Sequence, residues 1–134
     1  MNMAQYKRYL LQQIRKDYEL FLVENKFTAE MVKVVVEDIS DQVPMPKDWT
    51  NLELRKSLIH GDGNFLVIDM EAGTLVAPAR LSGKRTPAGR YTNHSPAPNA
   101  VFERDGEDIN LILTRNVSAG EEITVNYRQA GQVR

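Results

Sequence analysis

Apolar residues recur at helical spacing between Met3 and about Val23, and this periodicity predicts an amphipathic helix. Neither glycine nor proline interrupts the segment, so nothing in it breaks a helix. A second helix is predicted from Ala29 to about Ile39, with Thr28 as its N-cap. The valine triplet inside this second segment also suits a short strand. Helix is the favoured interpretation of the two.

Beyond residue 50 the pattern changes to short strands separated by turns. Residues 43–50 form a proline-punctuated connector, in which Trp49 is expected to pack against the core. A glycine turn is predicted at 60–64, and the DGE turn at 105–107 predicts a hairpin. Strands are predicted over 54–59, 65–70, 74–79, 100–104, 108–114 and 122–127. The predicted fold class is therefore mainly β with N-terminal helices (α+β), divided into a helical extension over residues 1–50 and a β-rich domain over 51–134.

The least regular stretch is the loop at residues 90–100, RYTNHSPAPNA. Tyr91 is its one large apolar residue, so neither a core strand nor a helix is predicted there. Asparagine and serine side chains bond neighbouring backbone groups, and prolines fix the direction of the chain. A loop stiffened in this way can hold a small polar ligand. A long, well-determined turn without a ligand is the alternative.

The composition narrows the classes of function. Hydrophobic residues make up 42% and charged residues 26%, which is typical of a globular rather than a disordered chain. The formal net charge of −1 makes nucleic acid and anionic membrane unlikely partners. Cysteine is absent, which excludes disulfides, and the two histidines His60 and His94 are not expected to form a metal site. No apolar run could span a membrane, and no signal-peptide core is recognisable, so an intracellular protein is expected.

Three further motifs are ambiguous when each is taken alone. Gly61 and Gly63 suit a close approach of backbone to a ligand, but an ordinary tight turn is the favoured interpretation when they are taken alone. Glu121 and Glu122 resemble a carboxylate pair, but neighbours in a strand point to opposite faces, so no catalytic dyad is expected. The basic segment 80–90 suits a phosphate or acidic partner, or simply a solvated loop.

Several of these motifs follow one another in a specific order. A Gly-x-Gly turn is followed by the block RYTNHS with PN shortly after it, then by a hairpin, and finally by GEEITVNY. This order resembles the SET domain of protein-lysine methyltransferases over about Leu54 to Tyr127, and residues 51–134 would then form a minimal SET-like domain. The matching residues are Gly61, Gly63, Arg90, Tyr91, Asn93, His94, Ser95, Pro98, Asn99, Gly120, Glu121, Glu122, Thr124 and Tyr127.

The resemblance implies a fold, a cofactor and a reaction. Short β-sheets would surround a pseudoknot, in which the GEEITVNY segment threads beneath the RYTNHS loop. The methyl group of S-adenosylmethionine would be transferred to a lysine of a protein or peptide substrate, an in-line displacement in which the protein mainly positions the reactants. The residues implied to bind the cofactor are Gly61, Gly63, Arg90, Asn93 and His94, and those implied to be catalytic are Tyr127 and Tyr91.

The sequence departs from the SET pattern in four places. An aromatic that often precedes the family's insert, in a Glu-Tyr-x-Gly type context, has no convincing match in VAPARLSG. The insert before the NHS block is very short, Pro96 stands where the family often has cysteine, and no cysteine-rich post-SET segment follows Tyr127. The missing walls would come from the N-terminal helices or from a second copy of the chain, and the apolar stripe of the first helix favours a homo-oligomer. A non-catalytic SET-fold module acting in protein binding or assembly is the alternative hypothesis.

Overall fold

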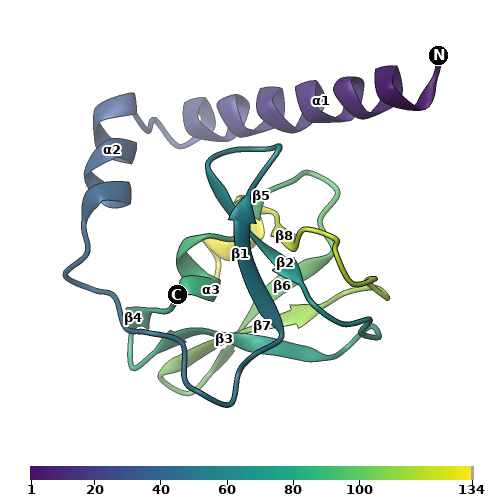
Figure 1. Ribbon diagram of the computed structural model, residues 1–134. Helices are drawn as coiled ribbons and strands as arrows, with labels where there is room; N and C mark the ends of the chain where they lie inside the picture. Colours follow the sequence, from purple (N-terminus) through teal and green to yellow (C-terminus); the bar gives the residue numbers. More distant parts are fainter. Residues whose placement is uncertain (134) are drawn as a thin grey trace.

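Two N-terminal helices lie outside a body of short β-strands (Figure 1). The computed structural model describes residues 1–133. Helix α1 spans Met3–Glu24 and begins at Asn2, whose side chain forms a capping box. Helix α2 spans Ala29–Glu37, and the Thr28 hydroxyl caps it by accepting a backbone N–H. Both predicted helices are confirmed, and the valine triplet belongs to α2 rather than to a strand.

The described residues of the body form three small sheets. Strands β1 and β2 make an antiparallel pair, β4, β3, β7 and β6 form a four-stranded antiparallel sheet in that order, and β5 pairs in parallel with β8. The α+β fold class is confirmed. The elements are β1 (Leu52–Lys56), β2 (Asp62–Leu66), β3 (Leu75–Leu81), β4 (Lys84–Arg85), α3 (Pro87–Arg90), β5 (Asn93–His94), β6 (Ala100–Asp105), β7 (Asp108–Leu113), β8 (Thr124–Val125) and α4 (Tyr127–Ala130).

The hairpin at 105–107 is confirmed, since β6 and β7 pair up to this turn. Four other strand predictions are wrong in their bounds. The strands predicted over 54–59, 65–70 and 74–79 are β1, β2 and β3, at Leu52–Lys56, Asp62–Leu66 and Leu75–Leu81. Strand β2 begins at Asp62, inside the predicted glycine turn, because the residues that follow pair with β1. The last strand, predicted over 122–127, is limited to β8. Tyr127 instead begins α4, because the Asn126 side chain caps that helix.

The loop at 90–100 is also more regular than predicted. Asn93 and His94 form the buried strand β5, although the polar composition of the loop predicts no strand there. A polar strand can be buried when each of its polar groups finds a partner. The Ser95 N–H, for example, donates to the carbonyl of Val125 at 3.0 Å. Partners from distant parts of the chain therefore override the local preference of the loop for solvent.

The C-terminal segment that contains β8 is bonded to both sides of the body. Its Glu121 carbonyl accepts the Leu66 N–H of β2 at 3.0 Å. On the other side, the buried Asn99 side chain donates to the Glu122 carbonyl at 2.9 Å and accepts the Thr124 N–H at 2.9 Å. One amide side chain thus fixes the segment that leads directly to Tyr127.

The hydrophobic core consists of aliphatic side chains from β2, β3, β7 and the C-terminal segment. Trp49 packs against the edge of this core, as predicted. The largest fully buried aliphatic side chains are those of Leu66, Val76, Leu111, Leu113, Ile123 and Val125.

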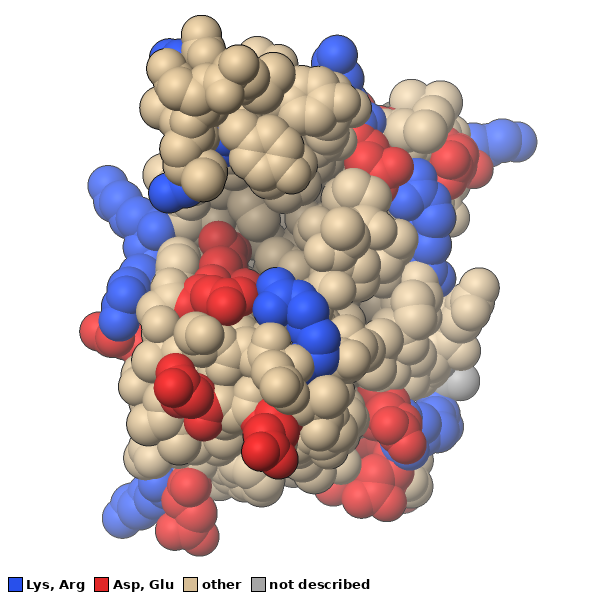
Figure 2. All heavy atoms as spheres, turned by 90° about the vertical axis from the view of Figure 1, so that its right-hand side faces the viewer, with Lys and Arg blue, Asp and Glu red and all other residues tan. Residues whose placement is uncertain are grey.

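Helices α1 and α2 contribute no fully buried residue, so they lie on the body rather than within it. Tyr6, Tyr9 and Leu10 of α1 remain substantially exposed. The N-terminal end of α1 stands above the body as a largely uncharged projection, while charges of both signs are interspersed below it (Figure 2). No helix within residues 1–133 combines the length and the apolarity that crossing a bilayer needs.

Candidate active site

Two cavities share one aromatic side chain, that of Tyr127. The smaller cavity, of about 440 Å³, is lined by α1, α2, the turn at 59–62 and the residues around β5. The larger cavity, of about 560 Å³, is lined by β3, β6 and the C-terminal residues, with one contribution from α1. Both volumes fall in the range typical of ligand sites. Arg85 also lines both cavities, but its guanidinium is already bound to the Asp41 carboxylate at 3.0 Å.

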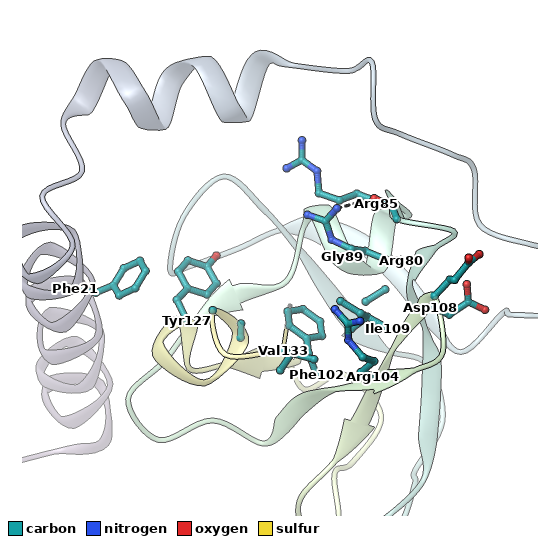
Figure 3. A pocket seen from close by; sticks show the side chains of 15 residues that line it. Phe21, Arg80, Arg85, Gly89, Phe102, Arg104, Asp108, Ile109, Tyr127 and Val133 are labelled. Carbon is teal, nitrogen blue, oxygen red and sulfur yellow. Dashed lines mark hydrogen bonds between the residues drawn. The ribbon is translucent and has the colours of Figure 1, made fainter.

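The larger cavity has an aromatic end and a charged end (Figure 3). The Phe21 ring points from α1 toward Tyr127, and Phe102 lies further into the cavity. Its charged lining residues carry both signs, and they are Arg80, Arg85, Arg104, Glu107 and Asp108.

Tyr127 is held at both its hydroxyl and its backbone. The hydroxyl donates to the Thr92 carbonyl at 3.0 Å, and the backbone N–H donates to His94 Nδ1 at 3.0 Å. Burial raises the pKa of the Tyr127 phenol above its ordinary value, and the neighbouring Tyr18 and Glu122 act in the same direction. The hydroxyl therefore stays protonated at neutral pH, and its single hydrogen is committed to the Thr92 carbonyl.

The ring of His94 is buried and bonded at both nitrogens. Because Nδ1 accepts the Tyr127 N–H, the proton of the neutral ring must be on Nε2. Nε2 lies 2.7 Å from Oδ2 of Asp17, which comes from α1. The His94 ring thus connects α1 to the first residue of α4.

Asn93 is anchored through its amide nitrogen. Nδ2 donates to the carbonyl of His60 at 3.0 Å and to Oε2 of Glu122 at 2.8 Å. Within residues 1–133 no group donates to Asn93 Oδ1, and no fully buried side-chain polar atom lacks a partner there. The oxygen is therefore not fully buried, although the residue is only 7% exposed, and Asn93 lines the smaller cavity. It is an acceptor that a bound ligand can use.

Gly63 does not line either cavity, and its role is to make room for Glu122. A Cβ at position 63 would collide with the Glu122 carboxylate. That carboxylate cannot move freely, because it accepts from the Ser57 hydroxyl at 2.7 Å and from Asn93 at 2.8 Å. A direct contact of Gly63 with the cofactor stays a prediction. In the structure the glycine leaves room for the Glu122 carboxylate, which in turn accepts from Asn93.

Gly63→Ala is expected to lower the free energy of unfolding by about 1–3 kcal/mol, the usual cost of overpacking. The Glu122 carboxylate would be displaced and the anchor of Asn93 weakened. Denaturant titration measures the loss. Gly131→Ala is the matched control, because a Cβ there makes only an ordinary contact. Equal losses in the two variants would show that the space beside Glu122 is not what requires glycine.

The remaining predicted site residues gather around the smaller cavity. Gly61, Arg90 and Tyr91 all line it. Gly61 has a φ of +47°, a conformation that favours glycine. The Arg90 guanidinium lies 5.2 Å from the centre of the Tyr91 ring and donates to the carbonyl of Val36 in α2. The structure thus brings together every residue predicted for the site except Gly63.

Several residues of the site were not predicted from the sequence. Asp17, Tyr18 and Phe21 reach it from α1, and Thr92 supplies the carbonyl that holds Tyr127. The helical periodicity places Asp17 and Phe21 on one face of α1, four residues apart. This spacing was the only feature of the sequence that linked the two residues, and it does not indicate which surface that face of α1 contacts.

Comparison with known proteins supports the resemblance to the SET family. A model of the SET domain family matches residues 12–128. A search of the curated proteins gave no match. Among solved structures, the crystal structure of a candidate histone methyltransferase of Plasmodium falciparum aligns with 57% of this chain and 92% of its own, at 17% identity and a TM-score of 0.48.

Because the family match covers most of the chain, the chain belongs to the SET domain family. SET-type methyltransferases generally use S-adenosylmethionine as methyl donor. The match begins inside α1, and the division at residue 50 into an extension and a SET-like domain stays a prediction. No group of His, Cys, Asp or Glu side chains among residues 1–133 is arranged to hold a metal ion.

Proposed function

We propose that this protein is an S-adenosylmethionine-dependent protein-lysine N-methyltransferase. The observation that carries the proposal is the position of Tyr127. Its ring lines both cavities, and its hydroxyl is fixed by the Thr92 carbonyl. One cavity would hold the methyl donor and the other the lysine side chain, so that the two reactants meet at this ring.

The smaller cavity fits the chemistry of S-adenosylmethionine, which when bound supplies an activated methyl group. The molecule combines a carboxylate, an ammonium group, a sulfonium and an adenine ring. The cavity has Arg15 and Arg90 for the carboxylate, and Asn93 Oδ1 for the ammonium group. The rings of Tyr18 and Tyr91 offer aromatic faces, which attract cations such as a sulfonium. Its volume of about 440 Å³ is ample for a ligand of this size.

The larger cavity suits the long apolar stem of a lysine. The rings of Phe21, Phe102 and Tyr127 provide an aromatic lining at one end. The raised pKa of Tyr127 is caused mainly by burial, so the surroundings of this ring disfavour charge. The same surroundings would favour the neutral form of a lysine amine, which is the form that can attack a methyl group.

Tyr127 would act by orienting the reactants rather than by removing a proton. Its hydroxyl hydrogen is bonded to Thr92, so the lone pairs of the oxygen remain free to accept hydrogen bonds. Burial disfavours a phenolate, which excludes the ring as a strong base at neutral pH. Fixed orientation of two reactants can by itself supply a large part of a rate enhancement.

Calorimetric titration with S-adenosylmethionine and with its demethylated product tests the cofactor site. Saturable binding is expected for the wild type and should be lost in Asn93→Ala, which removes Oδ1. Asn116→Ala is the matched control, because its side chain lies outside both cavities and bonds only the Ala72 N–H. A folded wild-type sample that binds neither compound would overturn the proposal.

Methyl transfer is then measured with a labelled methyl donor on an array of lysine-containing peptides. Label retained on peptides, and lost when the lysine is replaced with arginine, is the expected result.

A role in assembly is the second candidate function, and one observation favours it. Apolar side chains on both helices are exposed, among them Tyr6 and Tyr9 of α1 and Val34 of α2. A homo-oligomer formed through these helices would cover them. A non-catalytic assembly module needs no cofactor, so the titration described above also separates the two candidate functions.

A further inference from the structure

Asp17 of helix α1 bonds the ring of His94, which lies 77 positions later in the chain. We propose that Asp17 is a positioning residue for Tyr127, acting through the ring of His94. The inference rests on the proposed function, because it assigns to α1 a part in the same reaction.

Two hydrogen bonds in series connect the helix to the backbone of Tyr127. Oδ2 of Asp17 lies 2.7 Å from His94 Nε2, and His94 Nδ1 accepts the Tyr127 N–H at 3.0 Å. The hydroxyl of Tyr127 then donates to the Thr92 carbonyl at 3.0 Å. Tyr127 is thus fixed at its backbone by His94 and at its tip by Thr92.

The protonation states of Asp17 and His94 decide which group donates and which accepts in each of the two hydrogen bonds. A carboxylate only accepts hydrogen bonds, and Asp17 is ionised at neutral pH, since Arg128 above all holds its pKa below the usual range. His94 must therefore donate from Nε2 to Asp17, and Nδ1 is left as an acceptor for the Tyr127 N–H. A hydrogen bond to a charged acceptor is stronger than a neutral one, so Asp17 fixes the orientation of the ring.

Aromatic contacts from the same helix support this arrangement. The rings of Tyr18 and Phe21 lie 5.9 and 5.7 Å from the ring of Tyr127, both close to edge-on. Phe21 also stacks on His94 at 6.0 Å. These distances are in the favourable range for aromatic pairs. Asp17 therefore acts within a packed cluster, where a small tilt of His94 would move Tyr127.

A simpler role for Asp17 would be to hold α1 on the body through Arg128. The guanidinium donates to Asp17 at 2.8 Å and to Glu24 at 3.0 Å. Glu24 is thus a natural control, because it pairs with the same arginine from the same helix but makes no bond to His94. Asp17→Asn gives the second contrast, because its amide oxygen can still accept from Nε2 while its charge is lost.

Steady-state kinetics of Asp17→Ala, Asp17→Asn and Glu24→Ala separate the two roles. Asp17→Ala is expected to lower kcat by roughly 10- to 100-fold, as a misplaced reacting group does, with the cofactor KM changed only a few-fold. Glu24→Ala should stay within about twofold of wild type, and Asp17→Asn should recover most of the rate. Equal effects of Asp17→Ala and Glu24→Ala, or no recovery in Asp17→Asn, would show that Asp17 merely holds the helix.

A measurement without substrate tests the same chain of bonds. With two histidines in the chain, ¹⁵N-histidine NMR gives two ring systems, and His60→Gln assigns them. The wild type should show His94 protonated on Nε2 alone, with a low-field Nε2 proton that disappears in Asp17→Ala but persists in Glu24→Ala. Resonances of ¹³C-labelled Tyr127 should shift in Asp17→Ala only. A His94 ring protonated on Nδ1 would overturn the inference.

The kinetic and NMR measurements distinguish a failure of the proposed function from a failure of the role proposed for Asp17. If the wild type binds no cofactor and transfers no methyl group, the proposed function fails. The spectra still decide whether Asp17 orients His94 and Tyr127.

Discussion

Replacing Tyr127 with phenylalanine is expected to lower the rate of methyl transfer by roughly 10²-fold or more, which is the usual effect of misplacing a reacting group. The change removes only the hydroxyl, which bonds the Thr92 carbonyl, from a residue that lines both cavities. The ring itself, with its contacts to Tyr18, Phe21 and His94, is retained. The loss should therefore appear in kcat, with cofactor affinity close to that of the wild type.

The stability of the variant has to be measured alongside its activity. The Thr92 carbonyl loses its hydrogen bond, which is expected to cost about 1 kcal/mol of unfolding free energy. Thermal melts by circular dichroism then show that the loss of rate is not a loss of fold. Tyr9→Phe is the matched control, because Tyr9 is exposed on α1 and lines neither cavity.

Two outcomes would change the interpretation. Methyl transfer at the wild-type rate in Tyr127→Phe would remove the hydroxyl from the mechanism. No transfer in either protein, with assembly intact in both, would favour the non-catalytic module. Tyr91→Phe makes a useful comparison, because Tyr91 lines the smaller cavity alone and its change should affect the rate less.

Asn99→Ala is expected to destabilise the protein by about 2–5 kcal/mol, the largest stability effect among these variants. The side chain is buried and satisfies two backbone groups, the Glu122 carbonyl and the Thr124 N–H. Each would be left without a partner, at about 1–3 kcal/mol per buried group. A loss of this size is a large fraction of the stability of an ordinary domain.

Urea titration of Asn99→Ala beside Asn116→Ala measures the difference. Asn116 is exposed and satisfies one backbone N–H, so its replacement should cost less than about 1 kcal/mol. A small effect at Asn99 would mean that water takes over both bonds, and that the C-terminal segment is held mainly by its backbone pairing.

The local pattern of the sequence predicted the helices and the hairpin well. The periodicity from Met3 onward and the Thr28 cap specify α1 and α2, because helical spacing and capping act within a few residues. The DGE turn specifies the β6–β7 hairpin for the same reason. The ordered NHS and GEEITVNY blocks were also sufficient to indicate the SET family, which the family match confirms.

The same local pattern gave wrong results where distant residues complete the structure. Asn93 and His94 were predicted as loop residues. Their polar groups find partners in β8, Glu122 and Asp17, and these partners allow a buried strand. A ligand contact at Gly63 stays a prediction, but only the structure shows that a Cβ at this position would collide with the Glu122 carboxylate.

The sequence by itself determined the two N-terminal helices, the hairpin, the family and six of the sixteen residues that line the smaller cavity. Only the tertiary structure decided that α1 lies against His94 and Tyr127, and that one tyrosine lines two cavities. The physical reason is that periodicity defines which face of a helix is apolar, but not which surface that face will cover. Asp17 and His94 carry no common local signal, and their pairing exists only once the folded body presents the histidine ring to α1.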